Sequence, residues 1–333
     1  SLGDFVFLDE SEPGRRQVSA AWVLDSLVYE VTTFALDTAQ VALLPVGLIS
    51  DSDTLVAATP PVVVPVVSLV PEDAEGLRDI TDLAEFPVSG FACFEDALTT
   101  YLRQIDAGRN CRSAAIAGAG PVSGGHIILT KNDWCISQNS VSALLAGTPV
   151  RLFNDLQAAA LSIPMLNDAD MLPVVKTIDA PDPLENRLAI NIGTGFGASP
   201  LLYTVDGWFA AATEAGHMSL AATTAKELEL LSGSKPIFHS IEDALSGRGL
   251  QNLHACFADV DYDVPPSAQA VLASARSSKS AAQAVAMFTT LFARACGDLV
   301  LAHGAWGGVY LFGSVALEWS RQETSPSFAT VFT

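Results

Sequence analysis

Short apolar runs, each ending in a turn, recur through the second two-thirds of the chain. They cover residues 113–117, 150–153, 188–192 and 309–312, and each leads into glycines or into a polar pair. Short, bounded apolar runs predict buried strands. Because the turns gather at strand ends and helical segments lie between several of the runs, the pattern favours an α/β architecture with ligands at those ends.

Helical periodicity is clearest over residues 281–302, where apolar positions recur every three or four residues. These positions are Val285, Phe288, Phe292, Ala295 and Leu299. Ser280 and Gln283 have the spacing of a capping box, which predicts the start of this helix. A second helix is predicted over residues 94–105 by the spacing of its apolar side chains.

The N-terminal part of the chain has a less regular pattern. Residues 27–44 alternate partly between apolar and polar positions, which predicts a β-hairpin or two strands. The tract 56–71 is rich in Pro and Val and is typical of an edge strand or an extended surface run. We interpret residues 1–28, which are mixed and charged, as a leader whose secondary structure the pattern does not decide.

Composition narrows the classes of function. A length of 333 residues favours two lobes, and 50% apolar residues suffice for sizeable cores. The net charge of -20 repels phosphate backbones and anionic lipid, so we expect neither nucleic acid nor a membrane as a partner. The longest apolar stretch, residues 56–70, contains three prolines and is too short to span a bilayer. No signal-peptide pattern opens the chain.

The cysteines indicate a cytoplasmic location. There are 5, widely spaced and without a CxxC pair. This arrangement favours free thiols in a reducing compartment over a disulfide framework or a zinc site.

A glycine-rich turn at residues 193–197, GTGFG, follows one predicted strand and precedes another over residues 198–205. Glycines at this spacing let the backbone approach an anion closely, and Thr194 adds a hydroxyl donor. A phosphate-binding turn and an unliganded hairpin both fit this pattern.

A second glycine-rich string, GAGPVSGG at residues 118–125, comes close to a dinucleotide-binding fingerprint. Its spacing is GxGxxxGG, and Pro121 is followed by Val and Ser rather than by a good helix start. We therefore expect a tight turn that frames a ligand cleft. A nucleotide-dependent oxidoreductase remains as a third hypothesis, resting on this string alone.

Asp155 lies at the end of the apolar run 150–153 and directly before a helical run. Two interpretations remain open. Asp at this position is often the N-cap of the helix. A carboxylate at the end of a strand could instead accept a proton from a substrate hydroxyl, and the neighbouring Asn154 would offer a donor and an acceptor suited to a polyol.

Glu214, His217 and Glu242 form a loose polar set. A metal site is a poor interpretation, because no second His or Cys lies at ligand spacing from His217. Two carboxylates and an imidazole could surround sugar hydroxyls, but the spacing alone does not require it.

Six strings in a fixed order resemble the bacterial ATP-dependent glucokinases and cover roughly residues 90–333. They read AIAGAGPVSGGHIILTKNDW, FNDLQAAALSIPML, INIGTGFGAS, TEAGHMSL, EDALSGRGLQNL and GDLVLAHGAWGGVYLFG. The resemblance implies a two-lobed ribonuclease-H-like (actin-like ATPase) α/β fold that closes on sugar and ATP. We expect a small lobe over residues 29–155 and a large lobe over residues 156–333.

The resemblance also implies roles for single residues. Asp155 would be the general base that takes the proton from the sugar 6-hydroxyl. The other hydroxyls would be held by Asn154, Glu214, His217 and Glu242. The second phosphate loop would comprise Gly193, Thr194, Gly195 and Gly197, and Gly313 and Ser314 would lie near the adenosine. The implied cofactors are ATP and Mg²⁺, and the implied partner is a hexose, glucose. Family members are often dimers, so a homodimer is compatible with the resemblance.

The chain departs from the family pattern at several points. The family's D-x-G-G-T-N loop finds its best register at residues 33–38, with Thr33, Ala35 and Leu36 in place of the Asp and both glycines. Lys131 stands where the family has a sugar-facing Asn. The chain stops soon after Phe312, so we expect the family's final helix to be missing. The cysteine-rich zinc motif of the related repressor/kinase group is also lacking, which disfavours that branch.

Besides the oxidoreductase, two functions remain open at this stage. The first is a glucokinase that transfers the ATP γ-phosphate to the 6-hydroxyl of glucose, and the retained Asp155 and residues 193–197 motivate it. The second is a catalytically degenerate relative that binds a hexose as a sensor or regulatory module. The altered first phosphate loop motivates this second hypothesis, because phosphoryl transfer depends on positioning and on charge neutralisation.

Overall fold

The computed structural model describes the chain in segments. The described residues are 5–8, 20–24, 27–31, 34–36, 39–41, 43–44, 86, 88–104, 113–130, 133–166, 171–175, 182–205, 207–233, 238–260, 263–322 and 325–332, with side chains only from Phe86 onward. The chain divides into two compact units: a C-terminal unit, residues 1–9 with 171–333, and an N-terminal unit, residues 10–170. The lobe boundaries expected at residues 28/29 and 155/156 stay predictions.

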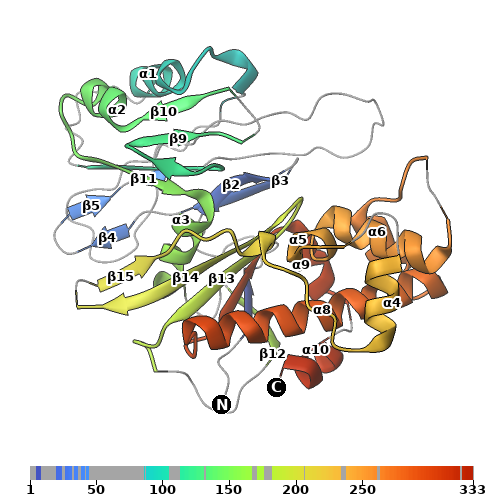
Figure 1. The fold of residues 1–333 in the computed structure, drawn as a ribbon. Coiled ribbons are helices and arrows are strands. Elements are labelled where there is room, and N and C mark those ends of the chain that lie inside the picture. Colours follow the sequence, from blue (N-terminus) through green and yellow to red (C-terminus); the bar gives the residue numbers. More distant parts are fainter. Residues whose placement is uncertain are drawn as a thin grey trace. The chain divides into compact units, whose positions relative to one another are not determined.

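A six-stranded mixed sheet lies at the centre of the C-terminal unit (Figure 1). Its strand order is β12 (Met171–Val175), β1 (Phe5–Leu8), β16 (Val309–Phe312), β13 (Arg187–Ile192), β14 (Phe196–Thr204) and β15 (Gly207–Ala210). The strands β1, β16 and β13 pair parallel, and β12, β14 and β15 pair antiparallel with their neighbours. Thus β1 places part of the expected leader in this sheet.

The two apolar runs at 188–192 and 309–312 become neighbouring inner strands, as their patterns predicted. Every residue of β16, and every residue of β13 after Arg187, is buried. Strands that are covered on both faces need continuous apolar runs rather than alternation. The carboxyl ends of β13 and β16 therefore lie side by side, with Asn191 in register with Phe312.

The helices of the C-terminal unit, drawn from yellow to red in Figure 1, lie together beside the sheet. They are η4 (Ala215–His217), α4 (Ala225–Gly233), α5 (Ile241–Ala244), α6 (Gly247–Ala258), α7 (Ala268–Ser274), α8 (Lys279–His303), α9 (Ser314–Ser320) and α10 (Ser325–Phe332).

Helix α8 confirms the long helix predicted from periodicity, and all five apolar positions named for it are buried. Its capping was predicted wrongly. Ser278 is the N-cap and accepts a hydrogen bond from the Ala281 amide, whereas Ser280 lies inside the helix and its hydroxyl contacts His254 Nε2 at 3.2 Å.

The segment that follows β16 is helical and forms α9 and α10, whereas the expected loss of the family's final helix stays a prediction. An aromatic cluster joins α9 and α10 to α8: the ring of Trp319 lies 5.0 Å from Phe292 and 5.2 Å from Phe328. The indole Nε1 of Trp319 donates to the Thr289 hydroxyl at 2.9 Å. Both helices are thus part of the core of this unit.

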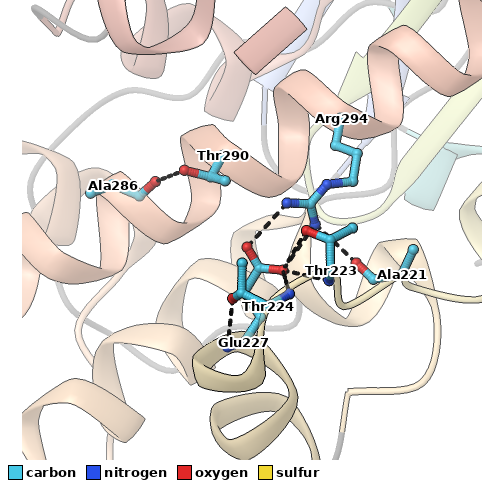
Figure 2. A network of polar contacts seen from close by, with 7 residues as sticks. All are labelled: Ala221, Thr223, Thr224, Glu227, Ala286, Thr290 and Arg294. Carbon is cyan, nitrogen blue, oxygen red and sulfur yellow. Dashed lines mark hydrogen bonds and ion pairs between the residues drawn. The ribbon is translucent and has the colours of Figure 1, made fainter. Parts of the chain in front are cut away.

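Helix α4 is fixed to α8 by an ion pair between Glu227 and Arg294, shown in Figure 2. Arg294 also donates to the Ala221 carbonyl at 3.0 Å. These contacts tie the segment between η4 and α4 to the longest helix of the unit.

Among the described residues, one helix, α8, is by length and composition apolar enough to cross a membrane. However, 61% of its most apolar window is buried inside the unit. Its apolar face is used for packing, as in the core helix of a globular domain.

The described part of the N-terminal unit contains four small sheets. They are β11 (Val150–Asn154), β7 (Ala114–Gly118) and β6 (Leu43–Leu44), all parallel; β10 (Cys135–Ser137), β9 (His126–Ile128) and β8 (Val122–Ser123), antiparallel; and the hairpins β2 (Ala20–Leu24) with β3 (Leu27–Val31) and β4 (Phe34–Leu36) with β5 (Ala39–Val41). The strands predicted within residues 27–44 are confirmed, whereas the tract 56–71 lies outside the described residues.

The helical elements of this unit are η1 (Val88–Gly90), α1 (Phe94–Gln104), α2 (Gln138–Leu144), α3 (Asp155–Ser162) and η2 (Ile163–Met165). Helix α1 confirms the prediction over residues 94–105 to within one residue. It packs Phe94, Leu98 and Tyr101 into a core that also holds Ile116 and Trp134. The inner strand β7 belongs to this core, which fixes the neighbouring strand β11 and therefore the start of α3.

Candidate functional site

Each unit carries one part of the expected site, and each part is described by itself. In the N-terminal unit, β11 pairs parallel with β7, so that Asn154 lies beside Gly118 at the end of both strands. Asn154 is the N-cap of α3: its Oδ1 accepts from the Leu156 amide at 3.0 Å, and Gln157 Oε1 accepts from the Asn154 amide at 3.1 Å. The capping interpretation of Asp155 is therefore wrong, because Asn154 has this role.

Asp155 is the first residue of α3, and it is buried, with 8% of its surface exposed. Its Oδ1 accepts from the Leu156 amide at 2.8 Å. Burial raises the pKa of Asp155 from 3.8 to about 6, although hydrogen bonds from Leu156 and Asn154 lower it. Near neutral pH, the carboxylate is mostly ionised and can accept a proton, which suits a general base.

Residues 118–125 form the end of β7, strand β8 and the turn into β9, so a strand rather than a helix follows them directly. Gly124 and Gly125 adopt φ values of 56° and 76° in the hairpin turn. A Cβ on Gly120 would overlap the carbonyl oxygen of Ile128. These glycines serve a tight turn, as expected, and the dinucleotide fingerprint lacks its helix. Lys131 lies outside the described residues.

In the C-terminal unit, the glycine-rich segment 193–197 is the connection of the β13–β14 hairpin. Gly193 to Gly195 make the turn, whereas Gly197 already lies in β14, in register with Asn191. The Gly193 amide donates to the Gly195 carbonyl at 3.0 Å, and the Gly193 carbonyl accepts from the Gly247 amide at 2.7 Å. Thr194 lies at the tip of the turn and is half-buried.

The set of Glu214, His217 and Glu242 is brought together beside this turn. His217 Nε2 lies 3.8 Å from Glu214 Oε2 across η4, with both side chains largely exposed. Segment 218–220 pairs with segment 239–241, because the Leu220 amide donates to the His239 carbonyl and the Ile241 amide donates to the Met218 carbonyl, each at 2.9 Å. This pairing connects η4 directly to α5, which carries Glu242.

Glu242 contacts the turn itself. Its Oε2 accepts from the Phe196 amide at 3.0 Å. Gly216 packs against the Phe196 carbonyl oxygen, where a Cβ would overlap it, and a Cβ there would lie 3.5 Å from Glu242 Oε2. The expected sugar-side carboxylate and the expected phosphate-side turn are thus in direct contact.

Gly313 and Ser314 lie at the carboxyl end of β16. Gly313 has φ 99°, and a Cβ on it would overlap Asn191 Oδ1 and the Ile192 carbonyl oxygen. A Cβ on Gly247 would lie 3.6 Å from Val315 Cγ2 and 3.3 Å from the Gly193 carbonyl oxygen. The end of β16 and the turn 193–195 therefore share one edge of the sheet, where ligands of such sheets bind.

Sequence reasoning missed the supporting residues of this edge. Gly216 and Gly247 permit close backbone approach, and Ser240 with Asp243 forms a capping box that fixes α5. The glycines in TEAGH and SGRG were the available signal, but their neighbours are remote in sequence.

No group of three or more His, Cys, Asp or Glu within the described residues could hold a metal ion.

The fold is that of solved sugar kinases, an α/β fold of the actin-like ATPase type. A glucokinase from an Antarctic psychrotroph has a TM-score of 0.66 at 24% identity, with 80% of this chain and 89% of that chain covered. A glucokinase from Balamuthia mandrillaris in complex with glucose has a TM-score of 0.57 at 19% identity, with 80% and 82% covered. At these identities the likeness shows the fold.

The family follows from sequence. The glucokinase family model matches residues 67–333, and the chain therefore belongs to the glucokinase family. A glucokinase from Nitrobacter hamburgensis is 31% identical over 264 residues, which is 76% of this chain and 80% of that protein. A glucokinase from Sinorhizobium medicae is 33% identical over 227 residues, and the chain spans 66% of its length.

Proposed function

We propose that this glucokinase-family chain transfers the γ-phosphate of ATP to the 6-hydroxyl of glucose, with Asp155 as the general base. The observation that supports the base most directly is the state of its carboxyl group. Asp155 is buried at the end of a parallel strand, and its pKa is about 6. A base with a pKa slightly below the working pH is ionised and accepts a proton readily.

ATP supplies the phosphoryl group. Asp155 takes the proton from the 6-hydroxyl of glucose. The 6-oxygen of the sugar forms a bond to the γ-phosphorus, while the bond from that phosphorus to the leaving ADP oxygen breaks. Because Asn154 caps α3 and Leu156 donates to Asp155, the carboxylate is held in one orientation. Positioning of this kind, rather than covalent help, is what phosphoryl transfer requires.

The remaining hydroxyls of the hexose would contact Asn154, Glu214, His217 and Glu242. The carboxylates and the imidazole can accept from hydroxyls, and the Asn154 amide can donate or accept. The exposure of Glu214 and His217 leaves their polar atoms accessible to a ligand.

The phosphates of ATP would lie against Gly193, Thr194, Gly195 and Gly197, and the adenosine near Gly313 and Ser314. These residues fit such a ligand because small residues at one sheet edge leave the backbone open to close approach. The described residues contain no carboxylate cluster for Mg²⁺, so we assign the ion no protein ligand and derive no step from it.

The comparisons do not support the catalytically degenerate alternative. The register that motivated it, residues 33–38, is described only as the backbone of β4 over residues 34–36. The oxidoreductase hypothesis loses its basis, because residues 118–125 lead into the β8–β9 hairpin.

We further propose that the protein is a cytoplasmic enzyme with lobes near residues 29–155 and 156–333. It would be able to form a homodimer and would have neither nucleic acid nor a membrane as a partner.

The direct test is formation of glucose 6-phosphate from glucose and Mg-ATP by the purified chain, with Asp155→Asn as the paired variant. We expect turnover in the wild type, and a loss of about 10³-fold in kcat with unchanged glucose affinity in the variant. Equal turnover in both proteins would reject Asp155 as the base. A wild type that binds glucose without turnover would reject the proposed reaction.

A further inference from the structure

Glu242 makes a contact that binding a sugar does not explain. Its Oε2 accepts a hydrogen bond from the Phe196 amide at 3.0 Å, across 46 residues of sequence. The same oxygen lies over Gly195, where a Cβ would come within 2.5 Å of it. The carboxylate therefore lies directly behind the turn that we assign to the nucleotide phosphates.

Glu242 is itself held rigidly. Ser240 caps α5, and Asp243 Oδ2 accepts from the Ser240 and His239 amides at 2.8 and 3.1 Å. The Ile241 amide donates to the Met218 carbonyl. Because α5 is fixed at its start, the Phe196 amide has a fixed acceptor rather than a mobile one.

We propose that Glu242 is a positioning residue for the turn 193–195, which we assign to the phosphates. It holds this turn through the Phe196 amide, in addition to its proposed contact with the hexose. The inference rests on the proposed function and adds a role to one of its residues. A turn with a fixed conformation loses less freedom when it binds an anion, so nucleotide affinity depends on this hydrogen bond. Through this contact, a proposed hexose-binding residue is also connected directly to the turn.

The direction in which nucleotide affinity changes when Glu242 is replaced distinguishes a positioning role from a purely electrostatic one. A carboxylate behind a phosphate-binding turn repels the phosphates, so removal of its charge alone should strengthen nucleotide binding. Removal of the hydrogen bond should weaken binding instead, because the turn relaxes and the Phe196 amide loses its charged acceptor. Three substitutions at this position separate the two effects.

Glu242→Gln keeps an acceptor oxygen and loses the charge. Glu242→Asp keeps the charge, but its side chain is one methylene shorter and cannot make the contact. Glu242→Ala loses both. The measurement is the dissociation constant of Mg-AMPPNP, by calorimetry without hexose, with thermal unfolding to verify that each variant is folded. Glu229→Ala is the charge control, because its carboxylate is exposed on α4 and has no assigned role in the site.

We expect Glu242→Asp and Glu242→Ala to weaken nucleotide binding at least about tenfold, Glu242→Gln to remain within about threefold of wild type, and Glu229→Ala to weaken it not at all. If Glu242→Ala does not fold, the contrast between Asp and Gln decides. Equal affinities in all variants, or a Gln variant that behaves like Ala, would overturn the proposal.

The test also separates this inference from the proposed reaction. Nucleotide binding that follows the expected pattern, without formation of glucose 6-phosphate by the wild type, would retain the positioning role and reject the reaction. Normal turnover with equal nucleotide affinities in all variants would retain the reaction and reject the positioning role. A wild type that binds no Mg-AMPPNP would reject both.

Discussion

The guanidinium of Arg294 donates to both carboxylate oxygens of Glu227, with Nη2 3.0 Å from Oε1 and Nη1 3.1 Å from Oε2 (Figure 2). Glu227 Oε2 also accepts from the Thr223 amide at 2.8 Å. Burial raises the pKa of Glu227, but hydrogen bonds from Arg294 and Thr223 lower it more, so that the pKa lies below its ordinary value. The segment between η4 and α4 is thus fixed to α8 by a largely buried ion pair.

Removal of the cation should be costly. We expect Arg294→Ala to lower the free energy of unfolding by about 3 kcal/mol, because it leaves the carboxylate of Glu227 buried without its partner. Urea unfolding measures this at neutral pH. The control is Arg321→Ala, which removes a more exposed pair with Glu318 and should cost less than about 1 kcal/mol. Equal costs for the two variants would contradict the role given to Arg294.

The same pair should stabilise the fold in a pH-dependent way. A carboxyl group with a lowered pKa in the folded state contributes stability above its unfolded pKa, here near 4.5, and loses it as pH falls through the folded value. We therefore expect the difference between wild type and Arg294→Ala to shrink as the pH is lowered below 4.5. Urea unfolding in a pH series tests this, and a constant difference would count against it.

The rate of phosphoryl transfer should decrease in acid. Since the pKa of Asp155 is about 6, we expect kcat/KM for glucose to fall about tenfold per pH unit below that value. Asp155→Asn should show a rate about 10³-fold lower and without this acid limb. A pH–rate series on both proteins measures the effect, and a limb that persists in the variant would assign it to another group.

Burial of Asp155 should also reduce stability at neutral pH. Between pH 3.8 and about 6, the unfolded chain has lost the Asp155 proton while the folded chain retains it, so the free energy of unfolding falls as pH rises. Relative to Asp155→Asn, we expect the wild type to lose about 3 kcal/mol across this window and to change no further above it. A difference that stays constant between pH 3.8 and about 6 would contradict this prediction.

A methyl group on Gly195 should impair nucleotide binding. It would lie 2.5 Å from Glu242 Oε2, so either the turn or the carboxylate must move. We expect Gly195→Ala to raise the KM for ATP at least about tenfold. Gly233→Ala is the matched control, since a Cβ there meets nothing within 4 Å. Equal KM values in the two variants would contradict a close-packed turn.

The helices after β16 should be needed for stability. Phe328 on α10 is fully buried against Phe292 and Trp319. We expect Phe328→Ala to cost 3–5 kcal/mol, roughly, and to change the fluorescence of Trp319. Val331→Ala on the same helix should cost less than about 1 kcal/mol, because Val331 is 40% exposed. A small cost for Phe328→Ala would show that α10 is loosely attached.

Local pattern was enough to predict the inner strands and the long helix. The run 309–312 coincides with β16, and the periodicity of residues 281–302 lies within α8. The start of α8 was misplaced because two serines lie near it, and only the fold shows that the hydroxyl of Ser280 is directed to His254. Capping depends on backbone geometry as well as on residue type.

For the candidate site, the sequence suggests residues, whose roles stay proposals, but not the contacts that these residues make. The sequence pattern left Asp155 open between a cap and a base; the hydrogen bonds of Asn154 exclude the cap, and the base stays a proposal. The contact of Glu242 with Phe196 joins residues 46 positions apart, and neither residue type signals it. Burial, which raises the pKa of Asp155, is likewise a property of the packed unit rather than of the local sequence.

The mixed pairing of β13 has a consequence for the order of folding. On one side, β13 pairs with β14 through a short turn; on the other it pairs with β16, which follows only after α4 to α8. Contacts between close neighbours in sequence form before those that must close a long loop. We therefore expect the hairpin with its glycine turn to form early. The edge at Gly313 and Ser314 would then be acquired late, so that the two sides of the proposed nucleotide site belong to different stages of chain collapse.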